Sequence, residues 1–249
     1  MLQVEAMRIV HIAVLALAAA FASAPAAAQP AGKRGDAAVS GDAAVLAARE
    51  AFAAGDRNRL ALAAAAIGEH PLRSYGEFWS LQLRLRSERN GTAVAVDRAV
   101  AEFMQRHPRT YVADRVRLDW LLNLGARREF DALLRERPAV VWGDDAQLRC
   151  YELLARYVTQ ERPKSLADEG RGLLAATRES STEGCAALAD ELIADRQLSP
   201  WTRVRALVEH NQLASARRAT AALPPADAAQ AAQIIEQPAR WLTTHERRI

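Results

Sequence analysis

Apolar residues recur at helical spacing through most of this 249-residue chain, and that periodicity limits the possible folds more than any other feature. Apolar stripes at three- and four-residue spacing run through residues 94–104 and 112–124. Leu60 and Leu62 are likewise expected on apolar helix faces. The Gly-Asp dipeptide at 55–56 predicts a helix end followed by the N-cap of the next helix. No segment shows the clear alternation of apolar and polar residues that a half-buried strand needs, so the sequence predicts an all-α protein.

Proline residues divide these helices repeatedly. The segment 70–75, His-Pro-Leu-Arg-Ser-Tyr, resembles the segment 107–111, His-Pro-Arg-Thr-Tyr, which begins 37 positions later; Pro138 and Pro163 break the chain again. Proline is tolerated at the start of a helix and not in its interior, so each site predicts a joint between helices, and the two histidines are expected to serve helix ends. Breaks about every 25 to 37 residues predict a TPR-like superhelical solenoid of short antiparallel helix pairs. A compact helical bundle is the alternative.

The first 28 residues have the parts of a secretory signal peptide. A cationic start at Arg8 precedes an apolar core that runs to Phe21, and small residues follow up to Ala28. The apolar core is shorter than the roughly 20 residues of a membrane-spanning helix, although an uncleaved anchor is the alternative. We expect export to the periplasm, cleavage after Ala28, and no stable membrane span in the mature chain.

Cleavage at that position would leave 221 residues in two parts. Residues 29–41 contain one proline and three glycines, which predicts a flexible lead-in, and residues 42–249 are predicted to form the α-superhelical domain. The composition, 50% hydrophobic and 25% charged, is typical of a folded chain rather than a disordered one.

The formal net charge is +3, and arginine supplies nearly all of the positive charge. Four arginine pairs stand at positions 115 and 117, 127 and 128, 203 and 205, and 217 and 218. We expect them to be solvated charge on helix surfaces. Contact with an anionic cell-wall polymer is the alternative.

Four blocks with characteristic residues follow one another between about residues 47 and 213. In chain order they are His70-Pro71-Leu72 with Tyr75 and Trp79, Pro108 to Leu124, Arg127 to Pro138, and Asp145 to Tyr151 with Gly184-Cys185. Together with the signal peptide and the two cysteines, this order resembles the N-terminal superhelical, U-shaped region of the soluble lytic murein transglycosylase family. The resemblance implies an all-α fold of short helices wound into a curved superhelix.

In that family the helical region stands beside a C-terminal domain that cleaves the MurNAc–GlcNAc bonds of peptidoglycan to 1,6-anhydro products. The resemblance implies a scaffold or substrate-positioning role in cell-wall turnover, with peptidoglycan glycan strands and a cell-wall enzyme as partners. It does not indicate which residues bind. The alternatives are a non-enzymatic periplasmic helical-repeat module that binds peptidoglycan or a partner protein, and an adaptor unrelated to the cell wall.

The catalytic signature of the family is not found in this sequence. The family uses one glutamate as general acid and then base, marked by Glu-Ser at a helix end and a Gly-Leu-Met-Gln segment downstream. Glu179-Ser180 is the one such dipeptide here, and no Gly-Leu-Met-Gln segment follows it. We therefore expect no catalytic residue and no peptidoglycan cleavage by this chain alone. A fragment, a frameshift and a shortened paralogue are all compatible with the sequence.

Cys150 and Cys185 are expected to form a disulfide, because an even number of cysteines in an oxidising compartment favours pairing. Two buried free thiols are the alternative. We expect no metal and no cofactor, because the histidines are scattered, the two cysteines lack zinc-site spacing, and no phosphate-binding glycine loop is present. Nucleic acid is not an expected partner, because the sequence lacks the interleaved aromatic and basic residues of single-strand binders.

Overall fold

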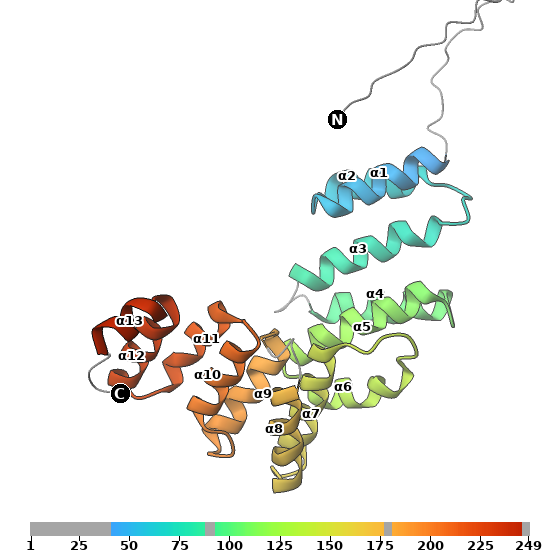
Figure 1. The fold of residues 1–249 in the computed structure, drawn as a ribbon. Helices are drawn as coiled ribbons and strands as arrows, with labels where there is room; N and C mark the ends of the chain where they lie inside the picture. The colour runs from blue at the N-terminus through green and yellow to red at the C-terminus, as the bar shows by residue number, and fades with distance from the viewer. Residues whose placement is uncertain (1–40, 88–92, 177–180, 246–249) are drawn as a thin grey trace, which may run out of the picture. The chain divides into compact units, whose positions relative to one another are not determined.

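The computed structural model describes residues 41–87, 93–176 and 181–245, all within one unit that spans residues 39–249. In these ranges the chain forms thirteen α-helices, two short 3-10 helices and no β-strand (Figure 1), which confirms the all-α prediction. None of these helices is long and apolar enough to cross a bilayer. The expected signal peptide and nearly all of the expected lead-in, up to residue 40, lie outside the described residues.

The helices are of ordinary length, and proline or glycine stands near many of their ends. They are α1 Gly41–Ala53, α2 Arg57–Ala66, α3 Arg73–Ser87, α4 Ala93–Arg106, α5 Tyr111–Ala126, α6 Phe130–Glu136, η1 Arg137–Ala139, α7 Ala146–Thr159, α8 Lys164–Ala176, α9 Glu183–Ala194, α10 Pro200–Glu209, α11 Leu213–Ala219, η2 Thr220–Ala222, α12 Pro225–Glu236 and α13 Pro238–His245.

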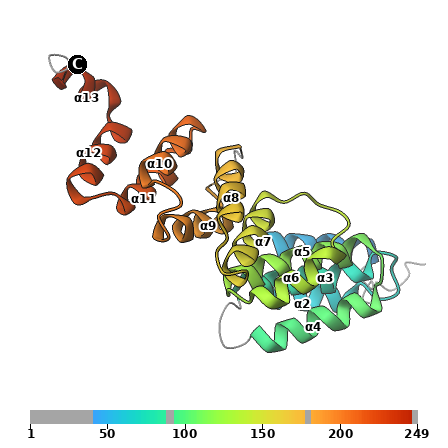
Figure 2. The same cartoon turned by 90° about the horizontal axis from the view of Figure 1, so that it is seen from below.

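Helices that are close in the chain are also neighbours in space. α1 packs against α2 and α3, and the odd-numbered helices then pack on one another in series, α3 on α5, α5 on α7 and α7 on α9. The even-numbered helices α4, α6 and α8 each contact the helices before and after them, and α10 to α13 follow in chain order. The colours in Figure 1 can be followed from α1 to α13 in the same sequence, and Figure 2 shows the same helices from below.

The helix joints lie where the sequence predicted them. Gly55 has a left-handed φ of 69°, and the Asp56 carboxylate accepts the Arg59 N–H at 3.0 Å as the N-cap of α2. The two His-Pro segments immediately precede α3 and α5. At the first of them, the His70 ring nitrogen Nδ1 accepts the Leu72 N–H at 3.0 Å. This histidine therefore satisfies a backbone donor at a helix start, as expected.

Several other helices end at a left-handed residue that is not glycine. Arg128, after α5, has a φ of 60°; its N–H donates to Gly125, and the next N–H, of Glu129, donates to Leu124, both at 3.0 Å. These two bonds form a Schellman motif, which usually places glycine at the left-handed position. Arg196 and Asn211 take the same conformation after α9 and α10. Because the motif carries arginine or asparagine here, the sequence gives no glycine signal for these ends.

Two of the apolar positions assigned to buried helix faces are exposed. Leu60 is 1% exposed, whereas Leu62 is 76% exposed, and Val94 at the start of α4 is 80% exposed. Residues two positions apart on a helix point roughly 200° apart around its axis, so Leu60 and Leu62 cannot face one core. The expectation for Leu62 and Val94 was therefore wrong. The main core joins buried side chains of α3 to α9, and smaller clusters lie under α1–α2 and α10–α12.

Three helices approach one another closely around Tyr151 of α7, whose side chain is 1% exposed. Gly125 of α5 and Gly184 of α9 both face its ring. A Cβ atom at either position would overlap the ring atoms, so both glycines are required by this close approach. The ring therefore lies in direct contact with the backbones of both neighbouring helices.

Candidate functional site

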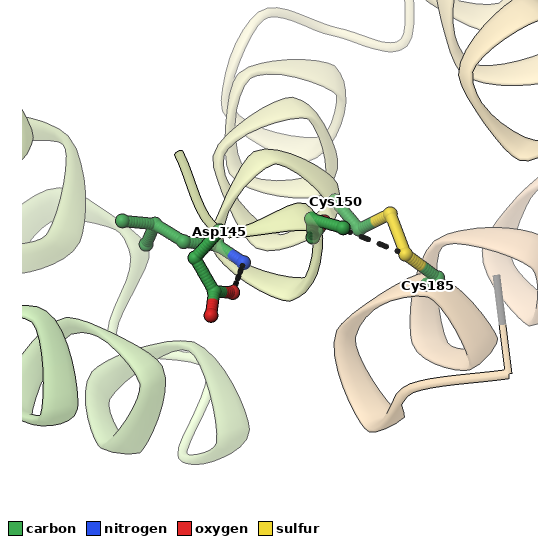
Figure 3. The surroundings of a disulfide bond; sticks show 5 residues. Asp145, Cys150 and Cys185 are labelled. Carbon is green, nitrogen blue, oxygen red and sulfur yellow. Dashed lines mark hydrogen bonds between the residues drawn. A yellow bond between two sulfur atoms is a disulfide. The ribbon is translucent and has the colours of Figure 1, made fainter. Parts of the chain in front are cut away.

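The two cysteines join α7 to α9 within the main core. The sulfur atoms of Cys150 and Cys185 lie 1.99 Å apart, at bonding distance, in agreement with the predicted pairing. Both residues are fully buried. Figure 3 shows the bridge beside Asp145, whose carboxylate caps α7 by accepting the Leu148 N–H at 2.8 Å. A disulfide with no solvent contact cross-links the fold and offers no reactive sulfur to a substrate.

Glu179 belongs to the Glu-Ser dipeptide that lacks the rest of the catalytic signature. It lies among residues 177–180, which are outside the described residues. Within the described ranges, no three His, Cys, Asp or Glu side chains are grouped as metal ligands.

Two of the paired arginines are buried, so the interpretation of these pairs as solvated surface charge was wrong for them. The Arg127 side chain is 6% exposed and donates to both carboxylate oxygens of Asp97, at 2.9 and 3.0 Å. Arg203 of α10 is 5% exposed. Arg128, by contrast, is 53% exposed and forms an ion pair with Glu191. A charged group that faces a carboxylate across a helix interface can be buried, and periodicity alone does not reveal that partner.

A polar pocket of about 270 Å³ opens between the odd-numbered helices α3, α5, α7 and α9. Each of these four helices contributes at least one polar side chain to its wall. The pocket is lined by Gln82, Leu85 and Arg86 of α3, Asp119, Leu122 and Asn123 of α5, Gln147 of α7, and Glu183 of α9. Convergent polar groups fix the orientation of a ligand in a binding pocket, and here they come from all four helices. We refer to this site as the polar pocket.

Two hydrogen bonds fix α3 against α5 at the polar pocket. The Gln82 side-chain amide donates to the Asp119 carboxylate at 2.6 Å. The Asn123 amide donates to the backbone carbonyl of Leu85 at 2.7 Å. Gln82 and Asn123 are 7% and 5% exposed, so these bonds form away from bulk water, where an unpaired polar group would be costly. These bonds therefore hold the α3 and α5 walls of the pocket against each other.

Asp119 is one of three titratable residues that line the polar pocket, with Arg86 and Glu183, and its side chain is 22% exposed. Burial raises the pKa of its carboxyl above the ordinary value, and the hydrogen bond from Gln82 and the charge of Arg115 oppose the rise. The Arg115 guanidinium lies 4.0 Å from the carboxylate. A carboxyl held in this way can accept hydrogen bonds from a bound hydroxyl or amide group.

The spacing of two polar residues in the sequence could have indicated part of this pocket. Gln82 and Asp119 are 37 positions apart, the same offset that separates the two His-Pro segments. Gln82 and Asp119 therefore share the offset of the two His-Pro segments, and they lie on α3 and α5, which pack against each other. Applying the 37-residue offset to polar residues, rather than to the helix joints alone, would have paired these two side chains.

The raised pKa of Asp119 predicts a pH-dependent effect of the isosteric substitution Asp119→Asn. Because the folded state holds this proton more tightly than the unfolded state, the aspartate favours folding below its ordinary value of 3.8. That contribution is lost as the pH rises from 3.8 through the higher folded pKa. The substituted asparagine keeps an acceptor for Gln82 and carries no charge. We expect the variant to be more stable than the wild type at neutral pH.

Urea denaturation of both proteins across the acidic and neutral range measures this difference. The variant is expected to exceed the wild type in free energy of unfolding by less at low pH, where the wild-type carboxyl is protonated. A variant that is less stable than the wild type at neutral pH would show that the Gln82 and Arg115 contacts outweigh the cost of burying the charge.

Comparison of the chain with known protein families, with curated proteins and with solved structures finds no match to any of them.

Proposed function

We propose that this chain is an exported helical-repeat module that positions peptidoglycan glycan strands during cell-wall turnover and does not itself cleave them. The role is the one implied by its resemblance to the superhelical region of the soluble lytic transglycosylases. In this proposal the glycan binds in the polar pocket, and the surrounding helices form the scaffold.

The contacts between helices support a repeat architecture of solenoid type. A repeat protein buries its core by stacking each helical hairpin on the next, so contacts join elements that are close in the chain. That is the pattern of α3, α5, α7 and α9 with their intervening even-numbered helices. The 37-residue offset recurs both in the helix joints and in the Gln82–Asp119 pair.

The polar pocket is the single observation that carries the proposal. Its wall presents amide, carboxylate and guanidinium groups, from Gln82, Asn123 and Gln147, from Asp119 and Glu183, and from Arg86. Amides and carboxylates hydrogen-bond to hydroxyl and acetamido groups, which cover an N-acetylated amino sugar. Arginine pairs with carboxylates, which the peptide stems of peptidoglycan carry. A single pocket of this composition suits one amino sugar of a strand.

The disulfide supports export of the chain. Structural disulfides persist in oxidising compartments such as the periplasm and are rare in the cytosol. The bridge between Cys150 and Cys185 joins two helices that both contribute to the polar pocket, α7 and α9. Disulfide formation in the periplasm would therefore hold α7 and α9 together at the proposed binding site.

Retention on purified sacculi tests the proposed function. The mature chain is expected to co-sediment with sacculi at low salt and to release no 1,6-anhydro-muropeptides. A double substitution in the polar pocket, Arg86→Ala with Gln147→Ala, removes two hydrogen-bonding side chains at the pocket while sparing Gln82 and Asn123. We expect retention to weaken about tenfold, because each lost hydrogen bond contributes roughly 0.5–1.5 kcal/mol.

The matched control is Arg98→Ala on α4, an arginine side chain that is 83% exposed and is not part of the pocket. It removes the same charge and is expected to leave retention unchanged. Wild-type protein that stays in the supernatant at low salt would overturn the proposal. Equal losses in Arg98→Ala and the double variant would show that binding depends on net charge and not on the polar pocket.

A further inference from the structure

A pair of aromatic side chains lies exposed near the N-terminal end of α5. Tyr111, the first residue of α5, is 54% exposed, and Trp142, in the loop before α7, is 46% exposed. Their ring centroids are 6.2 Å apart. Neither the Tyr111 hydroxyl nor the Trp142 indole N–H hydrogen-bonds to another residue in the described part of the chain. We call this pair, with the adjoining groove, the aromatic platform.

A buried carboxylate holds the Trp142 loop in place. Asp114 is 4% exposed, and its two carboxylate oxygens accept the backbone N–H groups of Val141 at 2.9 Å and Trp142 at 2.8 Å. The loop is therefore anchored through its backbone, and the indole ring is left facing solvent. A preorganised aromatic side chain loses little conformational entropy when a ligand stacks on it.

The groove beside Trp142 has a volume of about 530 Å³ and carries positive charge. Arg109 and Arg117 line it together with apolar side chains and Asp114. The Asp114 carboxylate is already occupied by the two backbone N–H groups of the loop. Arg109 forms no ion pair in the described ranges, so its guanidinium is available to a bound anion.

We infer that the aromatic platform binds an acidic glycan, with a pyranose ring stacked on Tyr111 and Trp142 and a carboxylate of the glycan at Arg109. An aromatic face packs against the apolar C–H face of a sugar, and the free hydroxyl and indole N–H bond to ring hydroxyls. A proline-rich peptide also docks on exposed aromatic side chains, but it needs no cation beside them. Arg109 therefore favours the acidic glycan.

This platform shares no residue with the polar pocket. It adds a second sugar contact at a different part of α5, and the choice of a carboxylated amino sugar as the probe rests on the proposed function. Because the two sites are separate, substitutions can test each of them without altering the other.

Titration with the disaccharide GlcNAc–MurNAc, followed by calorimetry at low salt, tests the inference. The lactyl group of this probe carries a free carboxylate, and N,N′-diacetylchitobiose, called chitobiose below, is the neutral comparison. We expect the wild type to bind the acidic disaccharide more tightly than chitobiose. Trp142→Ala keeps the backbone N–H that Asp114 binds, and it is expected to weaken binding of both sugars about tenfold, from the loss of one stacking face.

Arg109→Gln is expected to bind both sugars with the affinity that the wild type has for chitobiose. The matched control is Trp241→Ala, since Trp241 is a partly buried tryptophan on α13 that is remote in the chain from the platform. This control should bind as the wild type does. Unchanged disaccharide binding in Trp142→Ala would overturn the inference, as would tighter binding of a proline-rich peptide than of either sugar.

The outcome is separable from that of the sacculus experiment. Loss of sacculus retention in the polar-pocket variant with no effect of Trp142→Ala on the disaccharide supports the proposed function and rejects the platform. Disaccharide binding that depends on Trp142, in a protein that sacculi do not retain, supports the platform and rejects the proposed function.

Discussion

Replacing both bridged cysteines, Cys150→Ala with Cys185→Ala, is expected to lower the free energy of unfolding by about 4 kcal/mol. The bridge joins residues 35 positions apart, and closing a loop of that length removes conformational entropy from the unfolded chain. Urea denaturation at neutral pH measures the loss as a lower transition midpoint. Alanine is chosen because both positions are fully buried, so a serine hydroxyl would add an unrelated cost.

The reduced wild-type protein is the control for this substitution, since it lacks the bridge and keeps the same side-chain volume. Its midpoint is expected to fall by nearly as much as that of the double variant. If the double variant unfolds at the same urea concentration as the oxidised wild type, the bridge does not contribute to the stability of this fold.

Removing the carboxylate partner of a buried arginine is the second substitution with a large expected effect. Asp97→Ala is expected to destabilise the protein by about 3–5 kcal/mol, because it leaves the Arg127 charge without its bidentate partner. The same carboxylate also accepts the indole N–H of Trp120 at 2.6 Å. Glu129, which lies 3.3 Å from Arg127, is 49% exposed and offsets only part of the loss.

Asp144→Ala is the matched control for Asp97→Ala. Asp144 also forms a bidentate pair with an arginine, Arg149, but the two side chains are 74% and 40% exposed. Exposed ion pairs contribute about 0–1 kcal/mol, so this substitution should have little effect on the urea transition. Similar costs for the two substitutions would show that the burial of Arg127 does not make it depend on Asp97.

The local signals in the sequence predicted the helix joints well. The Gly55-Asp56 joint, the His-Pro segments and the paired cysteines each depend on one short stretch or on one pair of residue types, and the structure places them as expected. Backbone constraints at glycine and proline act within a few residues, so they can be interpreted without knowing the tertiary fold.

Features that depend on a partner elsewhere in the chain were not predicted. The left-handed helix end at Arg128 lacks the glycine that marks such an end, and the burial of Arg127 follows from Asp97, which lies 30 positions away. The polar pocket gathers side chains from four helices, and the aromatic platform depends on the bonds of Asp114 to a loop 27 and 28 positions later. Helical periodicity gives the buried face of each helix and not the residue that faces it.

Tyr151 lies against the backbones of two helices. Substitutions at residues 125, 151 and 184 are therefore expected to depend on one another. A larger residue at 125 would require a smaller side chain at 151, and that smaller side chain would open a void beside Gly184. A larger residue at 184 would also meet the backbone carbonyl oxygen of Gln147, 2.6 Å from the added Cβ, so a smaller side chain at 151 would not be enough to accommodate it. Variants of this chain are therefore expected to retain all three residues or to replace them together. A sequence with this bulky ring and only one of the two glycines would have to separate α7 from one neighbouring helix.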